Sequence, residues 1–206
     1  MDLYVSSGSG QKTNTSYPFP ASITSLDALK EAVRFDHVAA RYADGKNNKG
    51  RLIRGYRSKK TFKSSNCLPM DCDNTNPNPL EPDIPENEWK SPADVAAAFP
   101  DVPFYVVYSR NHMKEKDGKS ARPRFHVYFI CSEYTDTDAY AQLKVTLQKK
   151  YPFFDDNALG AARFIYGSKV DEGEIIWHEG TKMLDEFLTE QAPAAETYTI
   201  PQGQRN

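Results

Sequence analysis

The chain has 206 residues and a formal net charge of −2 at pH 7, with 39% hydrophobic and 12% aromatic residues. This length and apolar content suit one large domain with a substantial core, and the net charge excludes a uniformly basic nucleic-acid coat protein. Three cysteines exclude a framework of paired disulfides. The sequence shows no cleavable signal and no apolar span, so we expect a soluble cytosolic protein with no membrane partner.

The N-terminal 24 residues include a stretch rich in Ser, Thr, Gly, Asn and Pro. This composition predicts a loosely ordered arm over residues 1–24. Thr24 and Asp27 then fit a capping pattern ahead of an amphipathic helix that we expect to run to about Tyr42.

A strongly basic run follows. From Lys46 to Lys63 there are eight Lys or Arg residues and no acid, interleaved with aromatic side chains. Such a pattern suits a phosphate backbone or the phosphates of a nucleotide, although a solvated charged face would look the same. Because the run leads directly to a pair of acids, we favour phosphate contact, with Arg57 and Lys60 as the preferred nucleotide-binding residues.

The acid pair stands at the end of an apolar run, Cys67-Leu68-Pro69-Met70-Asp71-Cys72-Asp73, which turn-forming Asn and Pro residues terminate. This pattern predicts a strand that carries carboxylates at its tip. Side chains alternate along a strand, so Asp71 and Asp73 share a face and Cys72 points away. Two close carboxylates repel unless a cation lies between them, and their oxygens suit Mg²⁺ or Mn²⁺. The alternative is an Asx-rich turn that only closes the strand.

Two further strands are predicted at residues 104–108 and 124–131, joined as an antiparallel hairpin by a long basic loop. Arg110, Lys114 and Lys116 in this loop are candidate nucleic-acid contacts. By alternation, Arg124, His126 and Tyr128 share one face, which we expect to be an outer or cleft face.

The rest of the chain predicts helices at 92–99, 135–151 and 182–191 and a strand at 175–177. Between them, Phe153-Phe154-Asp155-Asp156 again places carboxylates after apolar residues. The Pro- and Ala-rich residues 192–206 predict a linker.

Three features occur in order: Asp71-x-Asp73, Arg124-Phe125-His126, and Phe154-Asp155-Asp156 followed by Arg163. Together they resemble the motifs of the archaeo-eukaryotic primase superfamily, the primase-polymerases. The resemblance covers roughly residues 25–180 and is greatest to the compact primases of phages, plasmids and integrative elements, in which an Arg-Ser stretch precedes the acid pair and an Arg-Phe-x-x-Gly segment follows the third acid. The last seven residues resemble the entry to the helical C-terminal module of such proteins.

The resemblance implies an α+β fold, with an RRM-like antiparallel sheet and an additional α/β unit that together form a catalytic cleft. Residues 25–191 would form the catalytic domain, and residues 192–206 would begin a truncated module. It also implies a DNA primase and DNA polymerase of a phage or mobile element, acting in the bacterial cytoplasm. Its partners would be a single-stranded DNA template, nucleoside triphosphates and a helicase in the same or a neighbouring chain, although no residue here shows a helicase.

Nucleotidyl transfer in this family uses two Mg²⁺ or Mn²⁺ ions. The resemblance assigns Asp71 and Asp73 as metal ligands and leaves the third ligand between Asp155 and Asp156, with the family pattern favouring Asp155. His126 would contact the triphosphate. The other candidate phosphate contacts are Arg124, Arg163 and Lys169.

Three other functions are compatible with parts of this pattern. A metal-dependent glycosyltransferase also uses an acid-x-acid strand end, but an α/β nucleotide-binding half normally precedes it. A non-catalytic single-strand-binding module explains the basic runs but not three separated carboxylate sites. A rolling-circle nickase needs paired metal-binding histidines, and only His126 is present in this strand.

Overall fold

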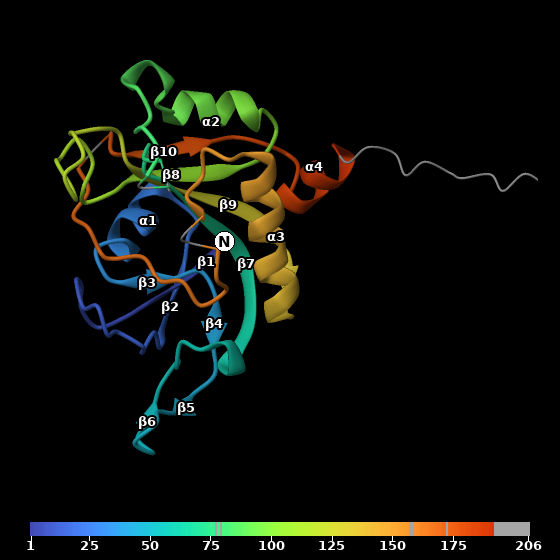
Figure 1. Ribbon diagram of the computed structural model, residues 1–206. Coiled ribbons are helices and arrows are strands. Elements are labelled where there is room, and N and C mark those ends of the chain that lie inside the picture. Colours follow the sequence, from blue (N-terminus) through green and yellow to red (C-terminus); the bar gives the residue numbers. More distant parts are fainter. Residues whose placement is uncertain (77, 79, 157–158, 172, 192–206) are drawn as a thin grey trace, which may run out of the picture.

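A five-stranded antiparallel sheet, in the order β10-β8-β9-β7-β4, lies at the centre of the computed structural model (Figure 1). The structure describes residues 1–76, 78, 80–156, 159–171 and 173–191, so the linker predicted at 192–206 lies outside the described residues. The strands of this sheet are β4 (Arg41–Tyr42), β7 (Phe62–Cys72), β8 (Phe104–Tyr108), β9 (Phe125–Tyr134) and β10 (Ile175–His178).

Two smaller sheets flank it. The first has the order β2-β1-β3, with β1 (Asp2–Val5), β2 (Phe19–Ser22) and β3 (His37–Val38), and the second is a two-stranded hairpin of β5 (Gly45–Lys46) and β6 (Leu52–Ile53). The described residues also form α1 (Leu26–Ala32), α2 (Pro92–Ala98), α3 (Thr137–Lys150) and α4 (Leu184–Glu190), with single 3-10 turns at Lys59–Thr61 and Glu86–Glu88. The fold is therefore mixed α+β.

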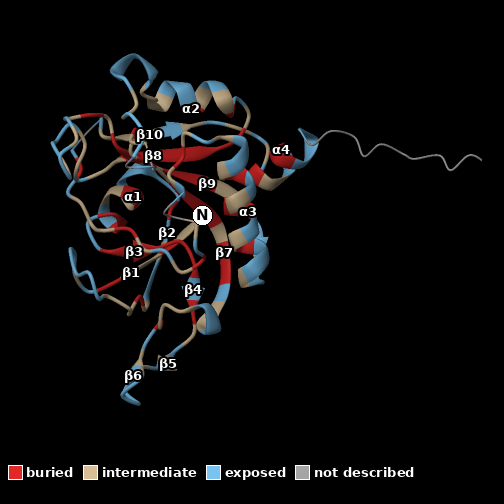
Figure 2. Ribbon diagram, viewed as in Figure 1, coloured by how far each residue is buried: buried red, intermediate tan, exposed pale blue. Residues whose placement is uncertain are grey.

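Both faces of the central sheet are covered (Figure 2). One face carries alternate apolar residues of β7, β8 and β9, such as Met70, Val106 and Phe129, and these pack against α2, α3 and α4. The other face carries Tyr128 and Val107, which pack against the N-terminal sheet and α1. Of the three residues expected on an outer or cleft face of β9, His126 is half-buried, whereas Arg124 and Tyr128 are buried.

Most predicted elements of the C-terminal two-thirds are confirmed. The β8–β9 hairpin is antiparallel, and α3 is capped by Asp136, whose carboxylate accepts the backbone N–H groups of Asp138 and Ala139. The helix predicted at 92–99 is α2, which begins with a capping box formed by Ser91 and Asp94. All three cysteines are free and buried, in agreement with the absence of paired disulfides.

The N-terminal predictions are wrong in three respects. Residues 1–24 are not a loose arm, because β1 pairs with both β2 and β3 and buries Leu3 completely. The helix is capped by Ser25 instead of Thr24, and it ends at Ala32 instead of near Tyr42. Beyond it, pairing of β3 with β1 draws the chain into an extended form, so that long-range pairing overrides the local helical pattern.

A buried histidine links the N-terminal sheet to the central sheet. His37 is 1% exposed, its Nδ1 lies 2.8 Å from the Phe35 carbonyl and its Nε2 lies 2.8 Å from the Tyr128 hydroxyl. A neutral ring satisfies both contacts by donating from Nδ1 and accepting at Nε2. Burial lowers the pKa of His37 to about 4.

This histidine makes stability depend on pH. Its folded-state pKa lies below its ordinary value, so the unfolded chain takes up a proton first as the pH falls, and the folded state loses stability between about pH 6.5 and 4. We expect the free energy of unfolding to fall by about 2 kcal/mol between pH 7 and pH 5 from this group. Urea unfolding at both pH values should show a smaller fall in His37→Gln; equal falls in the two proteins would contradict this assignment.

Candidate functional site

Asp71 and His126 face each other across two paired strands. They are directly opposite in the register of β7 and β9, and His126 Nδ1 lies 2.5 Å from Asp71 Oδ1. Burial alone would raise the pKa of Asp71, but the charge of His126, its hydrogen bond and the more distant Arg163 outweigh burial, so the pKa is lowered. Asp71 is therefore an ionised carboxylate at neutral pH that orients the imidazole.

Asp73 follows the end of β7, where Asn74 fixes the turn. Asn74 has a φ of 51°, and its side-chain nitrogen donates to the carbonyls of Lys90 and Pro123. Its side-chain oxygen accepts the Lys90 N–H, so one side chain joins three segments beside the acid. The Asp73 carboxylate forms an ion pair with Lys116 at 3.1 Å.

The third acid reaches the same place from a distant segment. The Asp155 backbone N–H donates to the Asp71 carbonyl at 2.9 Å, which attaches this segment to the end of β7. The preceding Phe154 is buried among core aromatics, including Phe99 and Phe129. With Phe154 turned inward, Asp155 lines the cavity and is half-buried, whereas Asp156 is exposed and is not among the lining residues.

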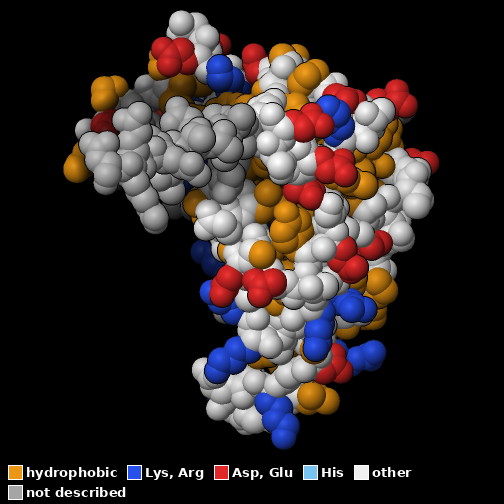
Figure 3. Space-filling model, turned by 90° about the vertical axis from the view of Figure 1, so that its right-hand side faces the viewer, with side chains coloured by type: hydrophobic (Ala, Val, Ile, Leu, Met, Phe, Trp, Pro, Cys, Tyr) orange, Lys and Arg blue, Asp and Glu red, His pale blue; other side chains and the backbone are white. Residues whose placement is uncertain are grey.

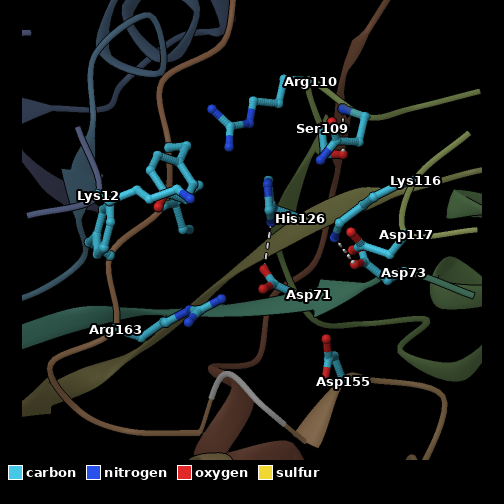
Figure 4. Close-up of a pocket in the computed structure, with 14 residues that line it drawn as sticks. Lys12, Asp71, Asp73, Ser109, Arg110, Lys116, Asp117, His126, Asp155 and Arg163 are labelled. Atoms are coloured by element: carbon cyan, nitrogen blue, oxygen red, sulfur yellow. Dashed lines mark hydrogen bonds and ion pairs between the residues drawn. The ribbon is translucent and has the colours of Figure 1, made fainter. Parts of the chain in front are cut away.

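These acids line a cavity of about 520 Å³, within the range of small-molecule sites. Four cationic residues share its wall: Lys12, Arg110, Lys116 and Arg163. Figure 4 shows Arg163 extending toward Asp71 and the Asp155 carboxylate pointing into the same space. A cavity lined by both carboxylates and cations can hold a metal ion together with the phosphates of a ligand.

The donor chemistry of Asp71, Asp73 and Asp155 fits Mg²⁺ or Mn²⁺, since all three supply hard oxygen ligands. However, among the described residues no three His, Cys, Asp or Glu side chains are close enough together to hold a metal ion. Asp71 is engaged by His126 and Asp73 by Lys116. Metal binding would therefore require these carboxylates to exchange partners.

Arg124 and Arg57, both predicted to contact phosphate, donate hydrogen bonds to loop carbonyls in this structure. Arg124 is 1% exposed and donates from one guanidinium nitrogen to the carbonyls of Asn111 and Lys114. Arg57 donates to the carbonyls of Asn14 and Ala162. Neither lines the cavity. A guanidinium is a planar fork of N–H donors, which matches loop carbonyls as well as phosphates, and in both cases it holds loops together.

The remaining predicted contacts lie outside the main cavity. Lys60 is exposed in the 3-10 turn before β7, at the opposite end of that strand from Asp71. Lys114 and Lys169 line a second cavity of about 360 Å³, which shares Ser109 and Arg110 with the first. Arg110 lies 4.1 Å from the centre of the Tyr166 ring, which fixes its position between the two cavities.

The sequence did not indicate Lys12 as a cavity residue, because it lies in the segment predicted to be a loose arm. The buried carboxylate of Asp36 holds that loop by accepting the backbone N–H groups of Gly10 and Gln11. It also accepts the N–H of Gly167, next to Tyr166 in the cavity wall. No local pattern reveals such a contact, since it depends on three segments that meet only in the fold.

Comparison with known proteins finds a distant likeness between this structure and a solved one. No protein-family model and no curated protein matches the sequence. The chain is similar to the AEP domain of the primase-polymerase of cyanophage S-2L, with 13% identity, a TM-score of 0.47 and coverage of 93% of this chain and 88% of that chain. None of the described helices has the length and apolar character needed to cross a membrane.

Proposed function

We propose that the chain is the catalytic domain of a template-directed nucleotidyltransferase of the primase-polymerase type, acting in replication of a phage or mobile element. The observation that carries this proposal is the meeting of Asp71, Asp73 and Asp155 with His126 and Arg163 in one cavity. These residues come from three segments of the chain, and neither a turn nor a simple binding surface accounts for their convergence.

The reaction joins the 3′-hydroxyl of a primer or first nucleotide to the α-phosphorus of a nucleoside triphosphate and releases pyrophosphate. When bound, two divalent ions would lower the pKa of the attacking hydroxyl and neutralise charge on the leaving oxygens. Asp71, Asp73 and Asp155 would hold them. Asp156 is the weaker candidate because it is exposed outside the cavity lining.

The cationic wall would bind the triphosphate. Asp71 engages Nδ1 of His126, whereas Nε2 has no hydrogen-bond partner among the described residues and is free to donate to a phosphate oxygen. Arg163 supplies a forked pair of donors to a second phosphate. Lys116 would leave Asp73 when a cation binds there and could then contact a phosphate oxygen.

We also propose the remaining features that the resemblance to primase-polymerases implies. These are an RRM-like core with the N-terminal sheet and α1 as the additional unit, a single-stranded DNA template, a helicase partner and a bacterial cytoplasmic location. The arrangement of β7, β8 and β9 between two packed layers supports such a core.

One assay tests the proposed reaction. The chain is incubated with single-stranded DNA, with and without a primer, and with labelled nucleotides in Mg²⁺ or Mn²⁺. We expect metal-dependent incorporation that follows the template sequence. If the protein binds DNA but incorporates nothing with any nucleotide or metal, the single-strand-binding alternative holds, and hydrolysis of a nucleotide sugar would favour the glycosyltransferase.

The ion pair between Lys116 and Asp73 gives a separate prediction for metal affinity. Lys116→Gln should bind Mn²⁺ about 1.4- to fivefold more tightly, because a half-exposed ion pair of about 0.2–1 kcal/mol no longer competes for Asp73. Free Mn²⁺ can be measured by electron paramagnetic resonance during a titration. Lys119→Gln is the matched control, since Lys119 lies in the same loop and pairs with Asp83 outside the cavity. Weaker Mn²⁺ binding in Lys116→Gln would contradict this role.

A further inference from the structure

The β5–β6 hairpin projects from the end of the molecule opposite α2 (Figure 1). Over residues 44–54 it contributes no fully buried side chain, and its two strands pair only with each other. A two-stranded hairpin on its own is marginally stable in water. Packing in the core therefore gives this segment no structural role.

Positively charged side chains are concentrated on the hairpin and on the start of β7, and we call this region the hairpin surface. Figure 3 shows Lys and Arg side chains gathered over this end of the molecule. Lys59, close by, is paired with Asp138, but the exposed cations of the hairpin surface form no ion pair with any described residue. These exposed cations are Lys46, Lys49, Arg51, Arg54, Lys60 and Lys63.

The tip of the hairpin is ordered by its own hydrogen bonds. The Asn47 side chain accepts the backbone N–H groups of Lys49 and Arg51, and the Asp44 carboxylate accepts that of Gly55. Gly50 has a φ of 75°, which closes the turn without strain. The cations thus project from a defined backbone, which lowers the entropy lost on binding an extended polyanion.

The hairpin surface is connected to the candidate active site through shared loops. The Ser16 hydroxyl donates to the Arg54 carbonyl, and the Arg57 N–H donates to the Thr15 carbonyl, in the loop that carries Lys12 into the cavity. On the other side, the Arg57 guanidinium holds the carbonyl of Ala162, next to Arg163. Segments bearing cavity cations are thus attached directly to the base of the hairpin.

The strand β7 sets the distance from the cavity to the near edge of the hairpin surface. This strand runs from Phe62, near the hairpin, to Asp71 in the cavity. Nine residues at about 3.3 Å each span about 30 Å. A nucleic-acid duplex rises about 3.4 Å per base pair, so about nine base pairs cover that distance.

We propose that the hairpin surface binds the phosphate backbone of the template–product duplex at least about nine base pairs behind the point of synthesis, to judge from the span of about 30 Å along β7. The inference rests on the proposed function and names a second contact for its nucleic-acid substrate. Contacts of this kind are independent of sequence and sensitive to salt. An anionic membrane would also attract these cations, but the loops that connect them to the cavity favour a nucleic acid that occupies both surfaces.

The test measures binding of primer–template DNA to the whole chain, without nucleotide or metal, by fluorescence anisotropy. Two DNAs share one single-stranded overhang and have duplexes of five or fourteen base pairs. The variant removes three hairpin cations by the substitutions Lys46→Gln, Lys49→Gln and Arg51→Gln. The control removes three cations near α4 by the substitutions Lys149→Gln, Lys150→Gln and Lys182→Gln.

We expect the hairpin variant to bind the fourteen-base-pair DNA about tenfold more weakly and the five-base-pair DNA within about twofold of wild type. The slope of log affinity against log salt should fall by about three for the long duplex alone. Equal losses on both DNAs, an equal loss in the control, or binding to phosphatidylserine vesicles without any effect of duplex length would overturn the inference. Because no nucleotide is present, a failure here is distinct from a failure of the incorporation assay.

Discussion

Asp71→Asn is expected to lower the rate of nucleotide incorporation by at least about 1,000-fold, a loss of about 4 kcal/mol of transition-state stabilisation. The substitution keeps the shape of the side chain but removes the charge that would bind the metal and orient His126. Single-turnover primer extension in Mg²⁺ and in Mn²⁺ measures the effect, and a thermal unfolding scan of the same sample monitors the fold.

Asp138→Asn is the control for this loss. Asp138 is an exposed carboxylate on α3, outside the cavity, and it forms an ion pair with Lys59. The substitution Asp138→Asn should leave incorporation within about twofold of wild type. Asp71→Asn should unfold within a few degrees of wild type. If that variant retained near-full primer synthesis, Asp71 would not be a catalytic ligand.

His126→Asn is expected to lower kcat/KM for the nucleotide by about 100-fold, mainly through a higher KM. The asparagine amide can replace Nδ1 as the partner of Asp71 but does not reach the position of Nε2. His126→Gln is the matched variant, because its amide reaches toward the position of Nε2 instead.

Steady-state kinetics with both variants separates two roles of the imidazole. If Nε2 contacts the triphosphate, His126→Gln should retain about tenfold more kcat/KM than His126→Asn. If His126 only neutralises Asp71, the order of the two variants should reverse, which would contradict the assignment of a phosphate contact.

The sequence predicted the central sheet well because its strands carry strong local patterns. In β9, Phe125, Val127 and Phe129 alternate with His126 and Tyr128. That alternation determines which side chains pack against the helices α2, α3 and α4. The position of the acids at 71, 73 and 155 directly after buried apolar segments was also predictable from the sequence. Their approach to one cavity depends on long-range contacts such as the bond from Asp155 N–H to the Asp71 carbonyl.

The N-terminal region could not be predicted in the same way. Strands β1 and β3 have four and two residues, and they form because they pair with each other across more than thirty positions of sequence. Local composition does not encode that pairing. Lys12 enters the cavity only because Asp36, far along the chain, holds its loop.

Arginine was the least predictable residue type for function. Arg57 and Arg124 belong to the stretches that carry the family resemblance, yet both donate to loop carbonyls inside the fold. Arg163 has similar chemistry and faces the cavity. The exposed fraction distinguishes these arginines, because Arg124 is almost inaccessible whereas Arg163 is exposed. The exposure of a single arginine cannot be deduced from the residues next to it in the sequence.

The most direct test of the account compares Asp155 with its neighbour. Mn²⁺ is titrated with a non-hydrolysable nucleoside triphosphate analogue into the wild type, Asp155→Asn and Asp156→Asn, and bound metal is measured by electron paramagnetic resonance. If the three cavity acids form a divalent-cation site, Asp155→Asn should weaken Mn²⁺ binding at least about tenfold and Asp156→Asn less than about twofold. Equal affinities in all three proteins, or a larger loss in Asp156→Asn, would contradict a metal site at this cavity.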